Sequence, residues 1–181
     1  MHIKRLLAGV GSAVLLSIIF SVPTPAAPAP PAPWQGEPQQ ADSNCYKFNS
    51  AEKGFLARIN NERADRDLAK LTLDPEASKV GKVHTREMIK VGDLYHSTGD
   101  DFEKRLTNWW TIGENVGRGS NDVDQLHEAF MNSKDHRKNI LAPKMRFAGI
   151  GAIVDDDTLW VTVIFEKRRN PGTTLKMPDC N

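Results

Sequence analysis

Two histidines and one glutamate, from three separate segments, are the side chains of this sequence best suited to binding or proton transfer. Glu114 lies in the middle of the apolar, glycine-flanked run 112–117, while His96 precedes that run and His136 follows it. Two neutral imidazoles and one carboxylate suit zinc, and a fourth coordination position would remain open to water or a ligand. The competing interpretation is a buried hydrogen-bond network that fixes the walls of a cleft. In either case the fold must bring three distant segments together.

The helices that would carry these segments can be read from apolar spacing and capping residues. A first helix is expected to begin with Ser50 as its N-cap and to continue to about Arg66. Residues 71–73 then form a short connector. His127 is expected to be a structural histidine on a later helix. Three shorter helical segments are also predicted: 101–106, the segment capped by Asn121 or Asp122, and the run from Ser133 through Leu141.

The second helix has the clearest signals for its two ends. Asp74 supplies a capping acid, Pro75 stands at the first helical position, and Gly92 ends the helix. Its apolar stripe is expected to extend over residues 77–91. His84 lies on or beside this stripe, so we interpret it as a hydrogen-bonded core histidine and not as a ligand.

A β-hairpin is predicted in the C-terminal part of the chain. Residues 148–154 pair with 159–166 across the turn 155–158. Both faces of the second strand are mainly apolar, so this strand should be central and covered on both sides. Helices followed by short strands and such a hairpin define the α+β class. We expect a three-layer α-β-α sandwich with a central antiparallel sheet.

The N-terminal region has the features of an export signal. Lys4 and Arg5 precede an uncharged apolar stretch, and small residues follow it, so residues 1–26 are predicted to be a signal peptide cleaved after Ala26. An uncleaved membrane anchor is the alternative. Residues 27–44 form a linker rich in proline and alanine, and the folded domain spans 45–181. The expected location is therefore secreted, extracellular or cell-envelope, without stable membrane insertion after cleavage.

Charge and cysteine content narrow the choice of partners and of redox compartment. Without residues 1–26 the chain has 22 Lys and Arg against 23 Asp and Glu, a formal charge of −1, which argues against nucleic-acid binding. Cys45 and Cys180 lie at the two ends of the predicted domain. In an oxidising compartment they are expected to form one disulfide, and two free thiols are the alternative.

Four motifs occur in an order and spacing that resemble a known family. Together they look like the bacterial, secreted branch of the CAP superfamily, named after cysteine-rich secretory proteins, antigen 5 and pathogenesis-related proteins. The resemblance covers about residues 50–166. The motifs are Tyr95-His96-Ser97, Gly113-Glu114-Asn115, the run from Phe130 through Leu141, and Ala148-Gly149-Ile150-Gly151.

This resemblance implies an α-β-α sandwich with a cleft lined by two histidines and two acids, a cleft associated with divalent metal in relatives. The first histidine falls on His96, the first acid on Glu114 and the second histidine on His136. The second acid, three residues after the aromatic Phe130, falls on Ser133, which departs from the pattern of animal and plant members. The disulfide pattern of eukaryotic members is also missing.

Three functions remain open at this point. The first is a monomeric extracellular module that binds a small ligand, a cell-envelope component or a divalent metal such as zinc, without established catalysis. The second is a hydrolase, in which the two-histidine-plus-glutamate site activates water or His136 serves as the base for Ser133. The third is a lipid or sterol carrier, a binding mode known from other members. Its groove would be lined by Trp109, Trp110, Phe130 and Met131.

Overall fold

The computed structural model describes residues 45–106, 109–168 and 180 of the chain. These residues belong to one unit, which spans Asp42–Asn181. The predicted signal peptide, 1–26, and linker, 27–44, lie outside the described residues. None of the helices in the described part of the chain combines the length and the hydropathy needed to span a bilayer.

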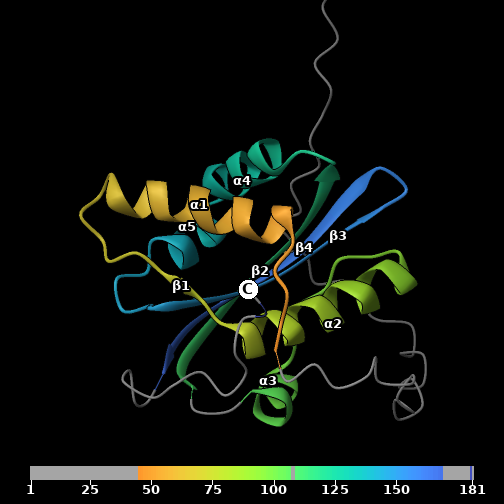
Figure 1. Cartoon of the computed structure of the whole chain (residues 1–181), viewed down its shortest axis with the longest axis horizontal. Helices are drawn as coiled ribbons and strands as arrows, with labels where there is room; N and C mark the ends of the chain where they lie inside the picture. The colour runs from red at the N-terminus through yellow and green to blue at the C-terminus, as the bar shows by residue number, and fades with distance from the viewer. Residues whose placement is uncertain (1–44, 107–108, 169–179, 181) are drawn as a thin grey trace, which may run out of the picture. The chain divides into compact units, whose positions relative to one another are not determined.

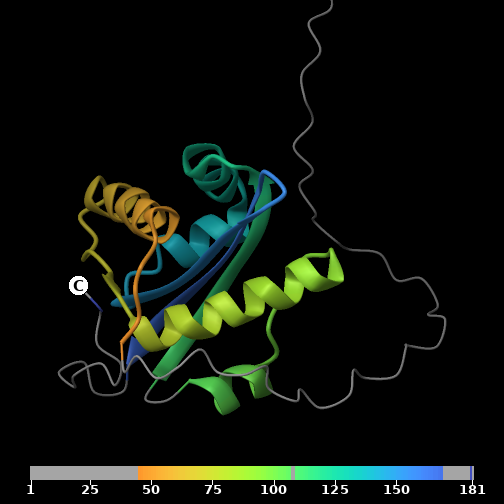
Figure 2. The ribbon, with the colours of Figure 1, turned by 45° about the vertical axis from the view of Figure 1, so that its right-hand side comes forward.

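A four-stranded sheet forms the middle layer, in the order β1-β3-β4-β2. Five helices cover it: α1, α4 and α5 lie on one face, and α2 and α3 lie on the other (Figures 1 and 2). The predicted α-β-α sandwich is therefore confirmed. The strands are β1 (Thr72–Leu73), β2 (Trp109–Ser120), β3 (Phe147–Asp155) and β4 (Thr158–Arg168). The helices are α1 (Ser50–Ala64), α2 (Pro75–Val91), α3 (Gly99–Arg105), α4 (Val123–Asn132) and α5 (Lys134–Ile140).

The prediction of a purely antiparallel sheet is wrong at one edge. β1 pairs with β3 in parallel, whereas β3–β4 and β2–β4 are antiparallel. The N–H groups of Thr72 and Asp74 donate to the carbonyl oxygens of Arg146 and Ala148 at 3.0 and 2.9 Å. The segment that we expected to be a plain connector is thus an edge strand. Two residues are too few to show the alternation that identifies a strand in a sequence.

The expected central position of β4 is confirmed. Val161, Val163 and Phe165 are fully buried in the core under α1, α4 and α5. On the opposite face, Trp160 and Ile164 pack in smaller clusters under α2 and α3. Because successive side chains of a strand point to opposite faces, a strand buried on both faces must be apolar at nearly every position.

The caps explain where the two long helices begin and end. Asp74 and Pro75 begin α2 and Gly92, with φ 76°, ends it, as predicted. For α1 the expected cap, Ser50, is wrong by one residue. The side chain of Asn49 accepts from the Glu52 N–H at 2.9 Å, and the Glu52 carboxylate accepts from the Asn49 N–H at 2.8 Å. An asparagine three residues before a glutamate fits this capping box, so the spacing contained the correct answer.

Helix α2 lies against β3 at backbone distance because three glycines form the contact. A Cβ atom on Gly151 would lie 2.1 Å from Lys82 N and 2.3 Å from Gly81 C. Thr85 secures the contact, since its hydroxyl oxygen lies 2.8 Å from Gly151 O and 2.9 Å from the Thr162 hydroxyl. The expected close approach of another backbone at Gly149 and Gly151 is confirmed. Met88 still packs on the sheet against Val116 and Trp160, but Val91 at the end of the helix, expected on the buried stripe, is 67% exposed.

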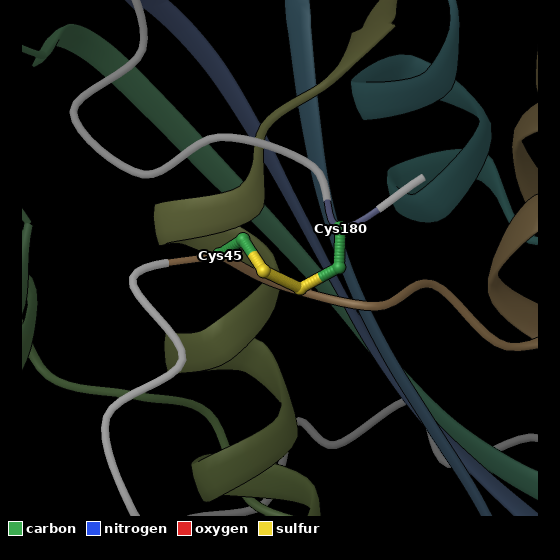
Figure 3. Close-up of a disulfide and its surroundings, with 2 residues drawn as sticks. All are labelled: Cys45 and Cys180. Atoms are coloured by element: carbon green, nitrogen blue, oxygen red, sulfur yellow. A yellow bond between two sulfur atoms is a disulfide. The ribbon is translucent and has the colours of Figure 1, made fainter.

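The predicted disulfide between Cys45 and Cys180 is present (Figure 3). The two Cα atoms are 5.0 Å apart, and 135 residues separate them in sequence. The Cys180 N–H also donates to Tyr46 O at 3.0 Å. In the chain-entropy model, closing so long a loop stabilises the fold by about 4–5 kcal/mol.

We predict that Gly151→Ala destabilises the domain by about 1–3 kcal/mol, because the added methyl group must push α2 away from β3. Gly119→Ala is the matched control, since a Cβ there meets only Leu126 Cδ1, at an ordinary 3.6 Å. Urea unfolding of both variants measures the difference. Equal stabilities of the two variants would show that the helix-sheet contact can relax without cost.

We also predict that His127 makes the stability depend on pH. His127 is 6% exposed on α4, and neither ring nitrogen has a hydrogen-bond partner among the described residues. Burial lowers its pKa; of the charges around it, Glu62 and Asp124 oppose this shift and Arg58 adds to it. The unfolded chain, with a histidine pKa of about 6.5, therefore takes up the proton first, and stability falls as pH drops below that value.

His127→Leu should remove this component, so its unfolding free energy should fall less steeply than that of the wild type between pH 7 and pH 5. Parallel urea titrations at several pH values make the comparison. Identical slopes for the two proteins would contradict the assignment.

Candidate functional site

His96 and Glu114 meet at the outer strand of the described sheet. His96 Nδ1 lies 2.9 Å from Glu114 Oε1. His96 belongs to the loop between α2 and α3, and its side chain is 60% exposed, whereas that of Glu114 is 5% exposed. The exposed imidazole of His96 thus contacts the buried carboxylate of Glu114 through Nδ1. Its other ring nitrogen, Nε2, could then bind a ligand.

The Glu114 carboxylate is held in place by three hydrogen bonds. Besides His96, the Ser97 N–H donates to Oε1 at 2.9 Å and the Ser97 hydroxyl donates to Oε2 at 2.8 Å. Burial alone would raise the pKa of Glu114, but these hydrogen bonds outweigh burial and hold that pKa below its ordinary value. The hydrogen bond to Glu114 in turn raises the pKa of His96. The pair is therefore charge-assisted at neutral pH.

Caps at both ends restrict the loop that carries His96. Gly92 ends α2, and its carbonyl accepts from Arg118 Nη1 at 2.9 Å. Thr98 begins α3 with a capping box to Asp101, in which the Thr98 N–H and hydroxyl donate to Asp101 Oδ2 at 2.9 and 2.8 Å. Only five residues lie between these two fixed points, so the freedom of His96 and Ser97 is small.

His136 approaches the same strand from the opposite layer. It lies on α5, with its ring edge-on to Phe130 at 4.8 Å between centroids. Burial lowers the pKa of His136, and the nearby charge of His96 lowers it further, while Asp135 raises it. His136 is therefore neutral at pH 7, when its lone pair is free to bind a metal ion or accept a proton.

Two asparagines connect α5 to β2 beneath His136. Asn115 Nδ2 donates to His136 O at 3.1 Å. Asn139 Nδ2 lies 2.9 Å from Asn115 Oδ1 and donates to Glu114 O at 3.1 Å. Asn115 is fully buried, so these bonds are shielded from water. Neither asparagine was predicted to be a site residue, although Asn115 directly follows Glu114 in the recognised motif.

Arg63 holds the far end of α5. It is fully buried on α1, and its guanidinium donates to the carbonyl oxygens of Ile140, Ala142 and Met145 at 2.8, 3.0 and 3.3 Å. Its Nε donates to Ala69 O at 2.8 Å. A cation at the C-terminal end of a helix satisfies carbonyl groups that the helix itself leaves unbonded. The short helix that carries His136 is thus held on β2 by the two asparagines and at its C-terminal end by Arg63.

Ser133, the position of the family's second acid, is the N-cap residue of α5 but makes no side-chain capping bond. The predicted set of three metal ligands is also not found as a metal-binding group among the described residues. Across residues 45–106, 109–168 and 180, no group of three or more His, Cys, Asp or Glu side chains is arranged to hold a metal ion. Metal binding by His96, Glu114 and His136 therefore stays a prediction.

The four residues proposed to line a lipid groove do not come together. Phe130 and Met131 belong to the main core under α1 and α4, whereas Trp109 packs under α2 and α3 on the other face of the sheet. Trp110 lies at an irregularity of β2 and is 62% exposed, with Lys167 Nζ at 5.0 Å from its ring centroid. An irregularity of this kind lets a strand residue turn its side chain outward, so Trp110 lines no groove with the other three.

The comparison with known proteins identifies the family. The profile of the cysteine-rich secretory protein family, CAP, matches residues 56–165, which is more than half of the chain. The chain therefore belongs to the CAP family, as the motifs had suggested.

Relatives and solved structures agree with this assignment. An uncharacterized protein of Bacillus subtilis, YkwD, is 30% identical over 115 residues, which are 60% of this chain and 44% of that protein. The chain thus matches less than half of the length of YkwD. An extracellular protein of Bacillus anthracis that contains an SCP domain has a similar fold, with a TM-score of 0.60 and 23% identity over 66% of this chain and 41% of its own. The structure of NaASP2 with Zn²⁺ matches with a TM-score of 0.53 and 14% identity, covering 80% of this chain and 88% of that one.

We predict that Glu114→Gln lowers the pKa of His96, because the charge and the charge-assisted hydrogen bond that raise this pKa are both weakened. NMR titration of the ring protons measures this pKa. Glu128→Gln, an exposed glutamate on α4, is the control and should leave the pKa unchanged. An unaltered His96 titration in Glu114→Gln would show that the 2.9 Å contact does not persist in solution.

Proposed function

We propose that this CAP domain is an exported binding module in which His96 and His136 hold a divalent metal ion, with zinc as the expected ion. The observation that carries the proposal is the His96–Glu114 pair, in which Nδ1 is fixed on a carboxylate while 60% of the His96 side chain is exposed. Imidazoles that bind metals usually place one nitrogen on the metal and the other on a carboxylate or carbonyl.

This arrangement assigns Glu114 a different part from the one predicted. Its two oxygens already accept three hydrogen bonds, so we infer that it orients His96 and does not bind the metal directly. The protein would then supply two imidazole ligands, and water or a bound molecule would complete the coordination. A bound metal would act at this site as a Lewis acid and as an anchor for an anionic ligand.

The electrostatics of the two histidines support the proposal. The lowered pKa of His136 keeps its ring neutral at pH 7, as coordination requires. His96 has a raised pKa and must lose its proton when metal binds. Metal affinity should therefore weaken as pH falls through the pKa of His96, which lies above the ordinary histidine value of about 6.5.

The comparisons support the proposal at the level of fold. The structure of NaASP2 was determined with Zn²⁺, and its fold is similar to that of this chain. This similarity supports a test of metal binding by the same fold here. The similar protein of Bacillus anthracis is described as extracellular, which agrees with the export signal predicted over residues 1–26. We infer that the domain acts outside the cytoplasm, where its disulfide is stable.

Isothermal titration with zinc chloride at pH 7.5 tests the metal site. We expect one ion per domain, and we expect His96→Ala and His136→Ala each to weaken binding by at least tenfold while the circular dichroism spectrum is retained. His127→Leu removes a histidine from α4, outside the proposed site, and should bind as the wild type does. If the titration of the wild type with zinc gives no heat of binding, the metal proposal fails, and the alternative of a metal-free hydrogen-bond network is supported.

A further inference from the structure

We propose that His84 is a positioning residue for His96: it holds the carbonyl of Tyr95 and so fixes the loop on which His96 meets Glu114. The expected effect on zinc binding rests on the proposed function. The expected effect on the pKa of His96 rests only on the contact between His96 and Glu114. The sequence had suggested that His84 is an ordinary core histidine. Its contacts connect it to the candidate site.

The central contact lies between His84 Nε2 and Tyr95 O, which are 2.8 Å apart. A carbonyl oxygen can only accept, so Nε2 must carry a proton and donate it. His84 is 2% exposed, which shields this hydrogen bond from water. The ring also packs edge-on against the Tyr95 ring, at 4.9 Å between centroids and an interplanar angle of 89°.

The other side of the His84 ring is held by an ion pair between α2 and α3. His84 Nδ1 lies 3.6 Å from Glu87 Oε2. The guanidinium of Arg105 binds Glu87 with both Nη atoms, at 3.2 and 3.3 Å. Arg105 also lies 3.8 Å from Asp101, which closes the capping box at the start of α3. The Glu87–Arg105 ion pair therefore lies beside Nδ1, while the hydrogen bond of Nε2 to Tyr95 O fixes the ring.

Packing alone cannot fix His96, because 60% of its side chain is exposed. The adjacent Tyr95 is 40% exposed, and its ring packs edge-on against His84 itself. Hydrogen bonds restrain this part of the loop on both sides of His96. The Tyr95 carbonyl accepts from His84 Nε2, and the Ser97 N–H and hydroxyl donate to the Glu114 carboxylate. Removing the His84 bond would leave the stretch between Gly92 and His96 without its hydrogen bond at Tyr95.

Two substitutions separate hydrogen bonding from packing. His84→Leu keeps an apolar body but has no donor, whereas His84→Gln keeps an N–H group that can reach the Tyr95 carbonyl. His127→Leu is the matched control, since it also replaces a buried imidazole but lies in the core on the other face of the sheet. The full-length domain with its disulfide intact is used throughout.

The readouts are the pKa of His96 by NMR and the zinc dissociation constant by calorimetry. We expect His84→Leu to shift the His96 pKa down towards its ordinary value and to weaken zinc binding by about tenfold, as loss of an outer-shell contact commonly does. His84→Gln should restore both values to within a factor of about three of the wild type. His127→Leu should lower the thermal midpoint and change neither value.

An unchanged His96 pKa in folded His84→Leu would overturn the proposal, and so would an equal loss in His84→Gln. If the wild type binds no zinc, the proposed function fails, and the pKa comparison still decides the role of His84. If His84→Leu does not fold, the ¹H–¹⁵N spectrum of the wild-type imidazoles decides it. A slowly exchanging Nε2 proton on His84 would support the proposal, and an Nε2 without a proton would refute it.

Discussion

The structure depends on one close contact, in which glycines and small side chains bring the backbone of α2 against that of β3. Gly81, Gly149 and Gly151 form this contact, and Thr85 locks it with bonds to Gly151 and Thr162. A helix placed at this distance is fixed in both height and direction over the sheet. Because the loop with His96 leaves the end of α2, the contact on β3 also determines where His96 stands relative to β2.

The alternating geometry of a strand explains how two separate layers reach one site. Glu114 and Asn115 are neighbours on β2, so their side chains point to opposite faces of the sheet. Glu114 receives the loop from the α2 layer, while Asn115 holds the backbone of His136 from the α5 layer. β2 is an outer strand of the described sheet, so loops and helices from both layers can reach its edge. Two adjacent residues connect both layers to one site.

Features encoded by short-range patterns were predictable, and contacts that depend on tertiary geometry were not. The ends of α2 follow from a cap, a proline and a glycine, and the place of β4 follows from its two apolar faces. By contrast, the two residues of β1 contain no pattern, and the outward turn of Trp110 depends on an irregularity in the β2–β4 pairing.

The candidate site divides in the same way. The residues that contact Glu114 were predicted from the order of the motifs. The residues that hold this part of the structure in place, such as His84 and Arg63, were not predicted to do so. His84 has the spacing of a core residue, and its partner is a backbone carbonyl, which carries no side-chain signature in the sequence. Arg63 likewise bonds only to carbonyl oxygens. A charged residue on an apolar stripe is one signal that could have revealed such a support.

The disulfide has a mechanical consequence for whatever chain precedes the domain. Cys45 and Cys180 enclose almost the whole described fold in one covalent loop, with their Cα atoms 5.0 Å apart. Tension between the chain before Cys45 and the chain after Cys180 would pass directly from one sulfur atom to the other. The sheet and helices would carry almost none of that load. A pull applied to these two ends of the chain would leave the fold unloaded for as long as the sulfur-sulfur bond remains intact.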